Sequence, residues 1–350
     1  DRLHYLNTSG DKDQDGTHFW FDVRANLRRE MEDRKGRFSE NEVRGRIADV
    51  LGKVTAGRGL FDGVHVFTPH SDVPDDTTLR LVLLDPARQY SKQESRPATS
   101  GVLEYLKHNG TKPRFKGNRL VFVAPDAATL GRVRDAVRTA LAWASIVSDI
   151  STGRLNIDRL QENQAKKESE TADAVVLRAT RECYRWVLSP MLLASTDRDV
   201  QVEGFPMNTA GASFMDELTR ICEENELVVS IWSPIHLRSR LKELYWKDGK
   251  TAAKALAVWE DMQRYLYLPR LKTRGVFEQA VLKGTAAEDF FGTAYGQDGD
   301  KYEGFKLGDN NVQVDDTLLL IEPEAARAYR AKLLENDKGG TGGGGTGGGG

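Results

Sequence analysis

Cysteine is scarce in this 350-residue sequence, and its scarcity excludes two classes of cross-linked protein. The two cysteines, Cys183 and Cys222, are too few and too far apart for a zinc site, and neither has a nearby histidine in the sequence. Two cysteines also cannot form the disulfide framework on which small secreted domains depend. So little cysteine is typical of a reducing compartment, and we expect a cytoplasmic location.

The sequence also lacks a long apolar run and an excess of charge of one sign. Its longest apolar stretch is about five residues, at 120–124, whereas a membrane helix needs roughly 18. We therefore expect no contact with a membrane. Fifty basic residues against 52 acidic ones leave a formal net charge of −2, so no overall field attracts nucleic acid. Any contact with nucleic acid must be local.

What the sequence does contain is the mixture of a folded protein, with 39% hydrophobic and 29% charged residues. The exception is residues 336–350, which we interpret as a glycine-rich linker because 339–350 read GGTGGGGTGGGG. The sequence begins at Asp1 within an apparent structural element. We therefore interpret it as a fragment, with a further domain expected on each side.

Two aromatic-rich segments near the start predict a β-hairpin. They are residues 2–6 and 18–22, and the polar, glycine-containing stretch between them favours a turn. We interpret this hairpin as a β-wing at the end of an upstream helical unit.

Residues 26–54 predict two highly charged helices. The first opens at Asn26 and the second at Ser39, and both residue types are favoured at helix N-caps. Because the apolar positions of both helices are sparse, we expect them at a surface.

Three apolar segments predict the strands of an α/β domain. They are residues 64–67, 79–84 and 119–124, and the last two are the near-continuous runs of strands buried on both faces. A long amphipathic helix is predicted over 127–150. We expect a small three-layer α/β domain over residues 55–150.

A helical connector is predicted over residues 151–232. Its main helix should run from Asp158 to Leu188 and end before Pro190, which cannot continue a helix. The first half of this helix is almost wholly polar. We expect that half to project from the body or to contact a partner.

The last folded part, residues 233–335, is predicted to be a winged-helix-like domain. Helices at 234–246, 251–268 and 275–283 precede a glycine-turned hairpin, which is the order of a winged helix-turn-helix unit. The predicted fold class is therefore mixed α/β. It combines a small three-layer α/β domain, a helical connector and a winged-helix-like module.

The sequence has no complete phosphate-binding loop. The nearest string is DGKT, Asp248 to Thr251, but such a loop needs a glycine five residues before Gly249, where Leu244 stands. It also needs a preceding strand, whereas a helix is predicted there. We interpret Thr251 as a helix N-cap.

Two predicted strands end in aspartate, Asp85 and Asp126. Because active groups of open α/β sheets gather where the strands end, one hypothesis is a divalent-metal-dependent phosphodiesterase or nuclease built on both. The alternative is that each caps a turn, as strand-terminal aspartates often do.

Pro86 stands where an ATPase would have its catalytic acid. His65 and His70 lack a zinc-like spacing, so we expect no metal site.

Basic residues concentrate between Arg24 and Arg37. One interpretation is a solvated helical face with ion pairs four residues apart. The other is that Arg24, Arg28, Arg29 or Arg37 contacts a phosphate, either of nucleic acid or of a nucleotide held by a neighbouring ATPase domain.

Five phrases in order resemble one protein family. They are HFWFDVRANLRREMEDRKGRF (18–38), VHVFTPHSDVPDDTTLRLVLLDP (64–86), NRLVFVAPD (118–126) with LAWASI (141–146), LNIDRLQ (155–161) and YLYLPRL (265–271). Over about residues 1–335 the sequence resembles the large prokaryotic ATPases catalogued as domain of unknown function 499. Members are AAA-type P-loop proteins, often encoded beside DNA methyltransferases and helicases in anti-phage defence clusters.

The resemblance implies that this chain is the part downstream of the ATPase core, and that residues 1–25 are a β-wing that closes the upstream ATPase lid or winged-helix unit. ATP and Mg²⁺ would bind in the upstream domain, and no cofactor is expected here. The implied role is coupling and recognition, with DNA or a defence-cluster methyltransferase or helicase as partner. Two hypotheses remain beside it: the metal-dependent nuclease of Asp85 and Asp126, and a non-catalytic interaction scaffold that uses the polar half of the 158–188 helix.

Overall fold

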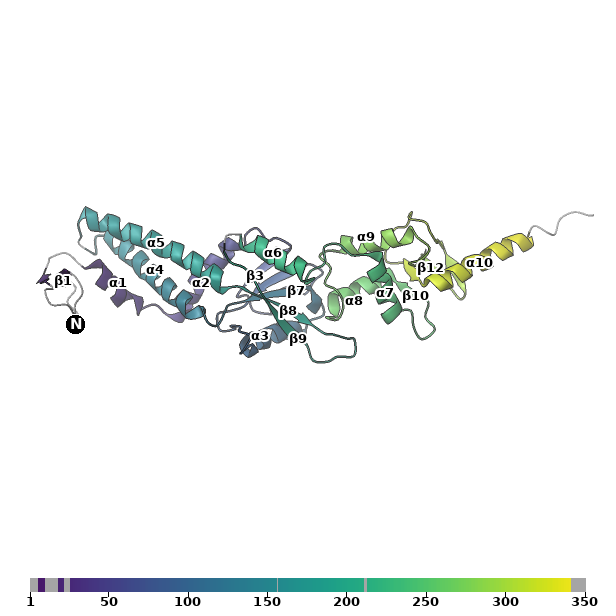
Figure 1. Ribbon diagram of the computed structural model, residues 1–350, viewed down its shortest axis with the longest axis horizontal. Helices are drawn as coiled ribbons and strands as arrows, with labels where there is room; N and C mark the ends of the chain where they lie inside the picture. Colours follow the sequence, from purple (N-terminus) through teal and green to yellow (C-terminus); the bar gives the residue numbers. More distant parts are fainter. Residues whose placement is uncertain (1–5, 10–17, 22–25, 156, 211–212, 341–350) are drawn as a thin grey trace, which may run out of the picture.

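The protein is elongated, and three parts follow one another along its long axis (Figure 1). A group of helices lies at one end, a five-stranded sheet covered by helices lies in the middle, and a smaller body of helices and short strands lies at the other end. The mixed α/β fold class predicted from the sequence is confirmed. The computed structural model describes residues 6–9, 18–21, 26–155, 157–210 and 213–340.

The predicted N-terminal hairpin is present. Strands β1 (Leu6–Ser9) and β2 (His18–Phe21) pair antiparallel, with Leu6 opposite Phe21. The described strand begins at Leu6, the last residue of the predicted segment 2–6, whose residues 2–5 are outside the described part of the chain.

The two charged helices begin where their capping residues predict. Helix α1 (Leu27–Lys35) follows Asn26, whose side chain accepts from the backbone N–H of Arg29 at 3.2 Å. Helix α2 (Glu40–Val54) follows Ser39, which forms a capping box. Only the charged faces of these helices lie at a surface, because an apolar stripe of each is buried. The buried apolar side chains are Leu27, Met31, Val43, Ile47, Val50 and Leu51.

Helices α4 (Leu130–Ser151) and α5 (Arg159–Cys183) form a long helical hairpin, against which α1 and α2 pack (Figure 1). The polar first half of α5 still buries Ala165 and Ala172. Small side chains at these positions allow α4 and α5 to approach closely, while the polar residues around them face solvent.

The central sheet has the strand order β3-β4-β7-β8-β9. The first three strands are parallel and lie where the sequence predicts them, whereas β8 and β9 are antiparallel to their neighbours. The bounds are β3 Gly63–Val66, β4 Arg80–Leu83, β7 Leu120–Ala124, β8 Trp186–Met191 and β9 Gln201–Pro206.

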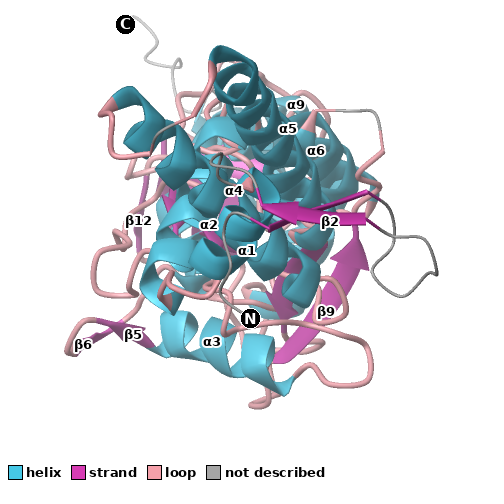
Figure 2. Ribbon diagram, turned by 90° about the vertical axis from the view of Figure 1, so that its left-hand side faces the viewer, coloured by secondary structure: helices cyan, strands magenta, loops and turns pink. Residues whose placement is uncertain are grey.

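Helices cover both faces of this sheet, which gives the predicted three layers. Leu81 and Val123 point to the face covered by α2, α4, α5 and α6 (Phe214–Glu224). Val82 and Phe122 point to the opposite face, covered by α3 (Arg96–Lys107). In Figure 2, α3 lies at the bottom of the view and α5 and α6 lie near the top. Burial on both faces explains the continuous apolar runs of β4 and β7.

The sequence prediction was wrong for the segment after Cys183. We expected the helix to continue to Leu188, but α5 ends at Cys183 and Trp186–Met191 forms β8 inside the sheet. Pro190 is tolerated there because β7 pairs with β8 only as far as Leu188, which leaves β9 as the single neighbour of Pro190. Residues 151–232 are therefore not only a helical connector, since they supply two strands and α6 to the sheet body.

The remaining helices and strands form a C-terminal body, residues 230–340. Its three-stranded antiparallel sheet has the order β10-β14-β11, and β12 and β13 form a separate hairpin. Ala252–Lys254, which we expected to begin a helix, instead forms β10. The bounds are α7 Pro234–Leu244, β10 Ala252–Lys254, α8 Ala255–Arg264, α9 Arg274–Thr285, β11 Gly292–Ala294, β12 Gly296–Asp298, β13 Lys301–Glu303, β14 Leu319–Ile321 and α10 Pro323–Gly340.

The half-buried His65 on edge strand β3 makes stability depend on pH. Burial, followed by the charges of Arg80 and Arg114, lowers the pKa of His65 below its ordinary value of 6.5. Below pH 6.5, His65 binds a proton in the unfolded chain more readily than in the folded chain. The free energy of unfolding therefore falls as the pH drops. We expect His65→Gln to flatten this dependence in urea unfolding at pH 7.5 and 5.5. If the free energy of unfolding changed between the two pH values as much in His65→Gln as in the unaltered chain, His65 would not be the cause of the pH dependence.

Candidate functional site

Asp85 follows β4 as predicted, but its carboxylate is already engaged. Arg44, from α2, donates a close hydrogen bond to Oδ2, and the backbone N–H of Ala87 donates to Oδ1 at 2.9 Å. The guanidinium of Arg44 also lies 5.2 Å from the centre of the Phe67 ring. Asp85 therefore fixes a turn and anchors α2 to the carboxyl end of β4.

Asp126 follows β7 and likewise has structural partners. Its Oδ1 accepts from the backbone N–H groups of Ala128 at 2.9 Å and Thr129 at 3.1 Å, at the start of α4. Its Oδ2 accepts from Trp186 Nε1 at 2.9 Å. One carboxylate thus caps a turn and ties α4 to β8.

The contacts of Asp85 and Asp126 give no support to a metal-dependent nuclease. Within the part of the chain that the structure describes, no group of three or more His, Cys, Asp or Glu side chains is placed to hold a metal ion. His70 is occupied too, since its Nδ1 accepts from the backbone N–H of Gly110 at 3.3 Å. These residues act in turns, which was the alternative interpretation of the sequence.

The basic cluster at α1 divides into structural and exposed residues. Arg24 lies outside the described residues. Arg34 is buried and contacts Glu30 and Asp149, each at 2.7 Å. Burial alone would lower its pKa, but the hydrogen bonds to these two carboxylates outweigh burial and raise it.

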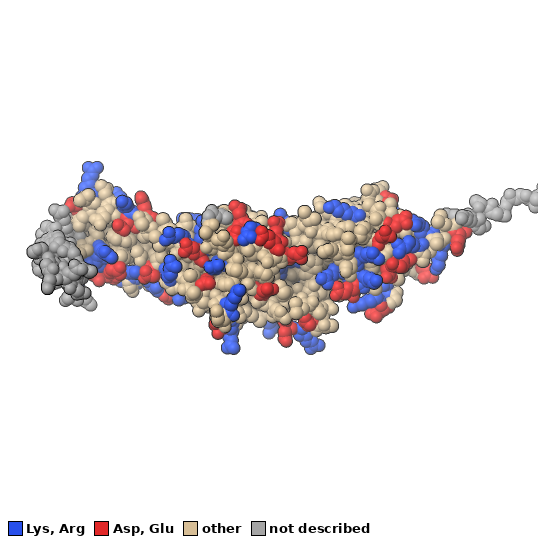
Figure 3. Space-filling model, viewed as in Figure 1, with Lys and Arg blue, Asp and Glu red and all other residues tan. Residues whose placement is uncertain are grey.

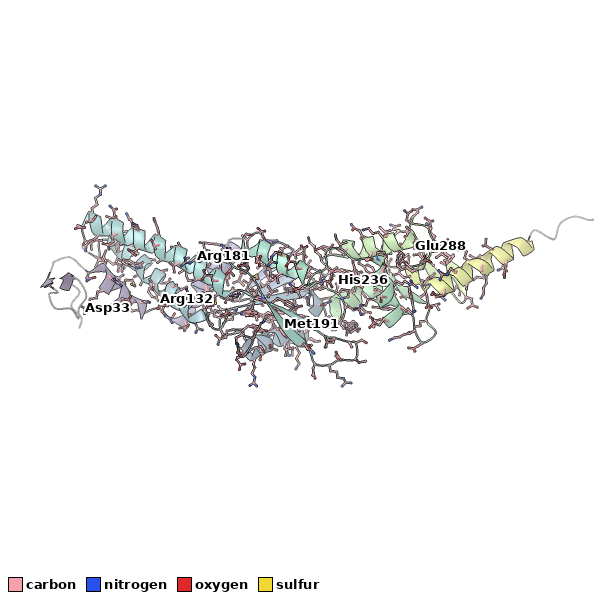
Figure 4. The ribbon with its side chains drawn as sticks, in the orientation of Figure 1. Asp33, Arg132, Arg181, Met191, His236 and Glu288 are labelled. Atoms are coloured by element: carbon pink, nitrogen blue, oxygen red, sulfur yellow. The ribbon has the colours of Figure 1, made fainter. Side chains whose placement is uncertain are left out.

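Arg28 and Arg37 are exposed and Arg29 is half-buried, so this part of the cluster can reach a phosphate. In Figure 4 the labelled Asp33 of α1 lies at one end of the molecule and Glu288 lies near the other. Figure 3 shows basic and acidic side chains intermixed over the visible face. Positive charge that could attract a phosphate is therefore confined to small groups of residues, as the near-zero net charge predicts.

A buried polar network, which we did not predict, joins the sheet body to the C-terminal body. It begins at Asn118, in the single turn of 3-10 helix Gly117–Arg119 that precedes β7. Asn118 Nδ2 donates to the carbonyl oxygens of Met262 at 2.8 Å and Leu268 at 3.1 Å. A side chain of the sheet body thus satisfies the end of α8.

Arg119 continues this network. Its guanidinium donates to the carbonyl oxygens of Leu271 at 2.6 Å and Lys272 at 2.9 Å, and lies 5.8 Å from the centre of the Trp259 ring. Two consecutive residues of the sheet body, Asn118 and Arg119, therefore hold the segment that follows α8.

Arg270 reaches across the same boundary in the opposite direction. Its Nε donates to the carbonyl oxygen of Asn118 at 3.0 Å, and one terminal nitrogen donates to that of Leu227 at 2.8 Å and to Ser189 Oγ at 3.2 Å. The backbone joins as well, since Val229 N–H donates to the Arg270 carbonyl at 2.9 Å. One side chain thereby connects three separate segments of the chain.

The two guanidiniums are buried charges with unusual surroundings. Their hydrogen-bond acceptors in the described structure are neutral oxygens, not carboxylates. Burial is the main cause that lowers the pKa of both guanidiniums, and the charge of Arg119 contributes to the lower pKa of Arg270; the pKa of each is about 10. Both remain protonated at neutral pH. Carbonyl and hydroxyl dipoles take the place that water would have around the terminal nitrogens of each guanidinium, whereas Nε of Arg119 has no hydrogen-bond partner in the described structure.

These residues lie within two of the family-like phrases, NRLVFVAPD and YLYLPRL. The second phrase follows the end of α8 and contributes to the core, because Leu268 and Leu271 are buried. Tyr265 and Tyr267 stack on each other, with ring centres 5.2 Å apart. The residues of the junction therefore lie within phrases that the sequence analysis singled out, but the sequence did not predict that these phrases contact each other.

Comparison of the chain with protein-family models, with curated protein sequences and with solved structures found no match. Among the described residues, no helix is both long enough and apolar enough to cross a membrane. The candidate site rests on the geometry of the junction itself.

Replacing Arg270 should loosen the junction. In Arg270→Met the carbonyl oxygens of Asn118 and Leu227 lose their donors inside the protein, so we expect the free energy of unfolding to fall by about 3 kcal/mol. Urea unfolding measures this value. The control is Arg154→Met, at an exposed side chain 3.6 Å from Asp149, which should change stability little. Equal losses in both variants would contradict the role of Arg270.

Asp126→Ala distinguishes the turn from the nuclease hypothesis. It removes the acceptor at the start of α4 and leaves Trp186 Nε1 without its partner, so we expect a loss of about 2 kcal/mol in urea unfolding. A nuclease residue would behave differently: Asp126→Asn and Asp85→Asn would abolish DNA cleavage in Mg²⁺ or Mn²⁺ while the fold stayed stable. Observing that cleavage and its loss would overturn the structural assignment.

Proposed function

We propose that this chain is the coupling and recognition part of a large cytoplasmic P-loop ATPase of prokaryotic anti-phage defence. It would link ATP and Mg²⁺ binding, and ATP hydrolysis, in an upstream domain of the same protein to DNA or to a partner protein, without a complete catalytic site of its own. The observation that carries this proposal is the buried junction of Asn118, Arg119 and Arg270, where two of the family-like phrases meet.

The elongated arrangement supports a coupling role. Arg34 ties α1 to α4, α4 and α5 pack against the sheet, and the junction ties the sheet to the C-terminal body. A displacement at the N-terminal end would reach the far end as a rigid-body movement, because buried contacts join each part to the next.

The order of elements in the C-terminal body supports a winged-helix module. The order is helix, strand, helix, helix, strand, hairpin and strand, with the last strand in the middle of the sheet. In this arrangement α9 takes the position of the helix that enters the DNA major groove. Arg274, Gln279 and Lys283 are exposed on α9, whereas the hairpin carries Asp298 and Asp300. We therefore assign phosphate contact to α9 and not to the hairpin.

Duplex DNA binding by the full 350-residue chain tests the recognition half of this proposal. We expect a salt-sensitive affinity, measured by fluorescence anisotropy, that falls at least about tenfold in Arg274→Glu/Lys283→Glu, with a shallower salt dependence. The matched variant Arg28→Glu/Arg37→Glu reverses two exposed charges at the other end of the molecule. An equal loss of DNA affinity in that variant would instead assign phosphate contact to the α1 end.

Two results would sink the proposal. The first is ATP hydrolysis by this chain alone at a rate lost on mutating one of its own residues. The second, for the DNA branch, is the absence of any salt-sensitive affinity for duplex DNA. That second result would favour the scaffold function, for which the solvent-exposed face of the polar half of α5 provides a surface, while its other face packs against α4. A defence-cluster methyltransferase or helicase would then bind, and Lys166→Glu/Lys167→Glu would weaken its binding.

A further inference from the structure

The boundary between the sheet body and the C-terminal body carries two surface features. One is a groove of about 1030 Å³, which residues of both bodies line, among them Met191, Trp232, Tyr267 and Leu268. The other is Phe115, whose side chain is 54% exposed. Among the side chains that the structure describes, no other aromatic ring is exposed to this degree. Phe115 is therefore the aromatic ring that is most accessible to a ligand.

The turn that carries Phe115 is fixed from both sides. The carboxylate of Asp75 accepts from the backbone N–H groups of Phe115 and Lys116, each at 2.8 Å. The preceding Arg114 is buried, and its guanidinium donates to four main-chain carbonyl oxygens of the sheet body. The backbone that presents the ring is therefore ordered before a ligand arrives, which lowers the entropic cost of binding.

A guanidinium from the other body lies against this ring. Arg264, at the end of α8, lies over the Phe115 ring at 5.8 Å and over the Tyr265 ring at 5.2 Å, both measured to the ring centres. Tyr265 in turn stacks on Tyr267. Arg264 is exposed and forms no ion pair in the described part of the chain. We call Phe115, Arg264, Tyr265 and Tyr267 the aromatic platform.

Two lysines flank Phe115 in the sequence. Lys112 and Lys116 have no carboxylate partner among the residues that the structure describes. The carboxylate that contacts this turn, Asp75, is already engaged, since it lies 3.8 Å from the guanidinium of Arg114. The free positive charges disfavour a cationic ligand and attract phosphate groups. A flat ring carried on a phosphate backbone matches both the exposed aromatic ring and these charges.

We propose that the aromatic platform binds an unpaired nucleobase of a single-stranded nucleic acid. The base stacks on the exposed face of Phe115, while Arg264 and Lys116 contact the neighbouring phosphates. Every base has a face that can stack, so the site tolerates any sequence. This inference does not depend on the proposed function, because the bases of duplex DNA at α9 stay stacked inside the double helix.

The affinity of the full chain for a single strand tests this proposal. The probe is a fluorescein-labelled oligothymidylate of about 15 nucleotides, followed by fluorescence anisotropy. Phe115→Leu keeps an apolar side chain but removes the ring, so we expect it to weaken binding at least about fivefold, whereas Phe115→Trp should preserve binding. The matched control is Leu160→Ala, at a leucine 76% exposed on α5, which should bind like the unaltered chain. Circular dichroism checks the fold of each variant.

An abasic oligomer of the same length separates stacking from attraction by charge. It carries the same phosphates without bases, so we expect it to bind the unaltered chain at least about fivefold more weakly than oligothymidylate. Oligouridylate, if it binds as tightly, adds RNA as a source of the base. Arg274→Glu/Lys283→Glu on α9 should leave these affinities unchanged.

Four results would overturn the proposal. They are the absence of binding to either oligonucleotide, equal affinity for the abasic oligomer, undiminished binding in Phe115→Leu, and competition by thymidine monophosphate as strong as by oligothymidylate at equal nucleotide concentration. The last result would assign the platform to a free nucleotide instead of a strand.

Discussion

The arrangement of this protein depends on two buried guanidiniums, Arg119 and Arg270, whose hydrogen bonds end on neutral oxygens of the opposite body. A charge in a protein interior is stable only if dipoles replace its water, and here the dipoles belong to segments that meet only when both bodies are in place. Separating the bodies would leave charges and carbonyl groups unsatisfied together. The sheet body and the C-terminal body are therefore held in one arrangement, and a movement of one is a movement of both.

The parts of the fold that were predictable are those where local sequence and burial agree. Strands β4 and β7 are continuous apolar runs because helices cover both faces of the sheet, and α1 and α2 begin at side chains that cap them. Strand β8 was missed because Trp186 to Leu188 continues the apolar positions of a helix and Pro190 argues against a central strand. The sheet can contain Pro190 because the pairing of β8 with β7 ends at Leu188, and this pairing is visible only in the folded structure.

The candidate site was less predictable, for a physical reason. An ion pair leaves two complementary residues in a sequence, whereas Arg270 bonds to main-chain carbonyls that any residue supplies. The positions of Asp85 and Asp126 at strand ends were predictable. Their partners were not, because Arg44 comes from a helix 41 residues earlier and Trp186 comes from a strand 60 residues later. Sequence patterns place a side chain at an edge, but its chemistry there depends on what the fold brings against it.

The groove and the buried network occupy the same boundary, which links binding to coupling. Leu268 lines the groove while its carbonyl oxygen accepts from Asn118, so one short segment serves both the surface and the interior. Residues of both bodies line this groove, so a ligand bound in it would contact both and would stabilise the junction against separation of the bodies. By linkage, an intact junction would stabilise the bound ligand by the same free energy. The affinity of the groove for a ligand and the stability of the junction would then depend on each other.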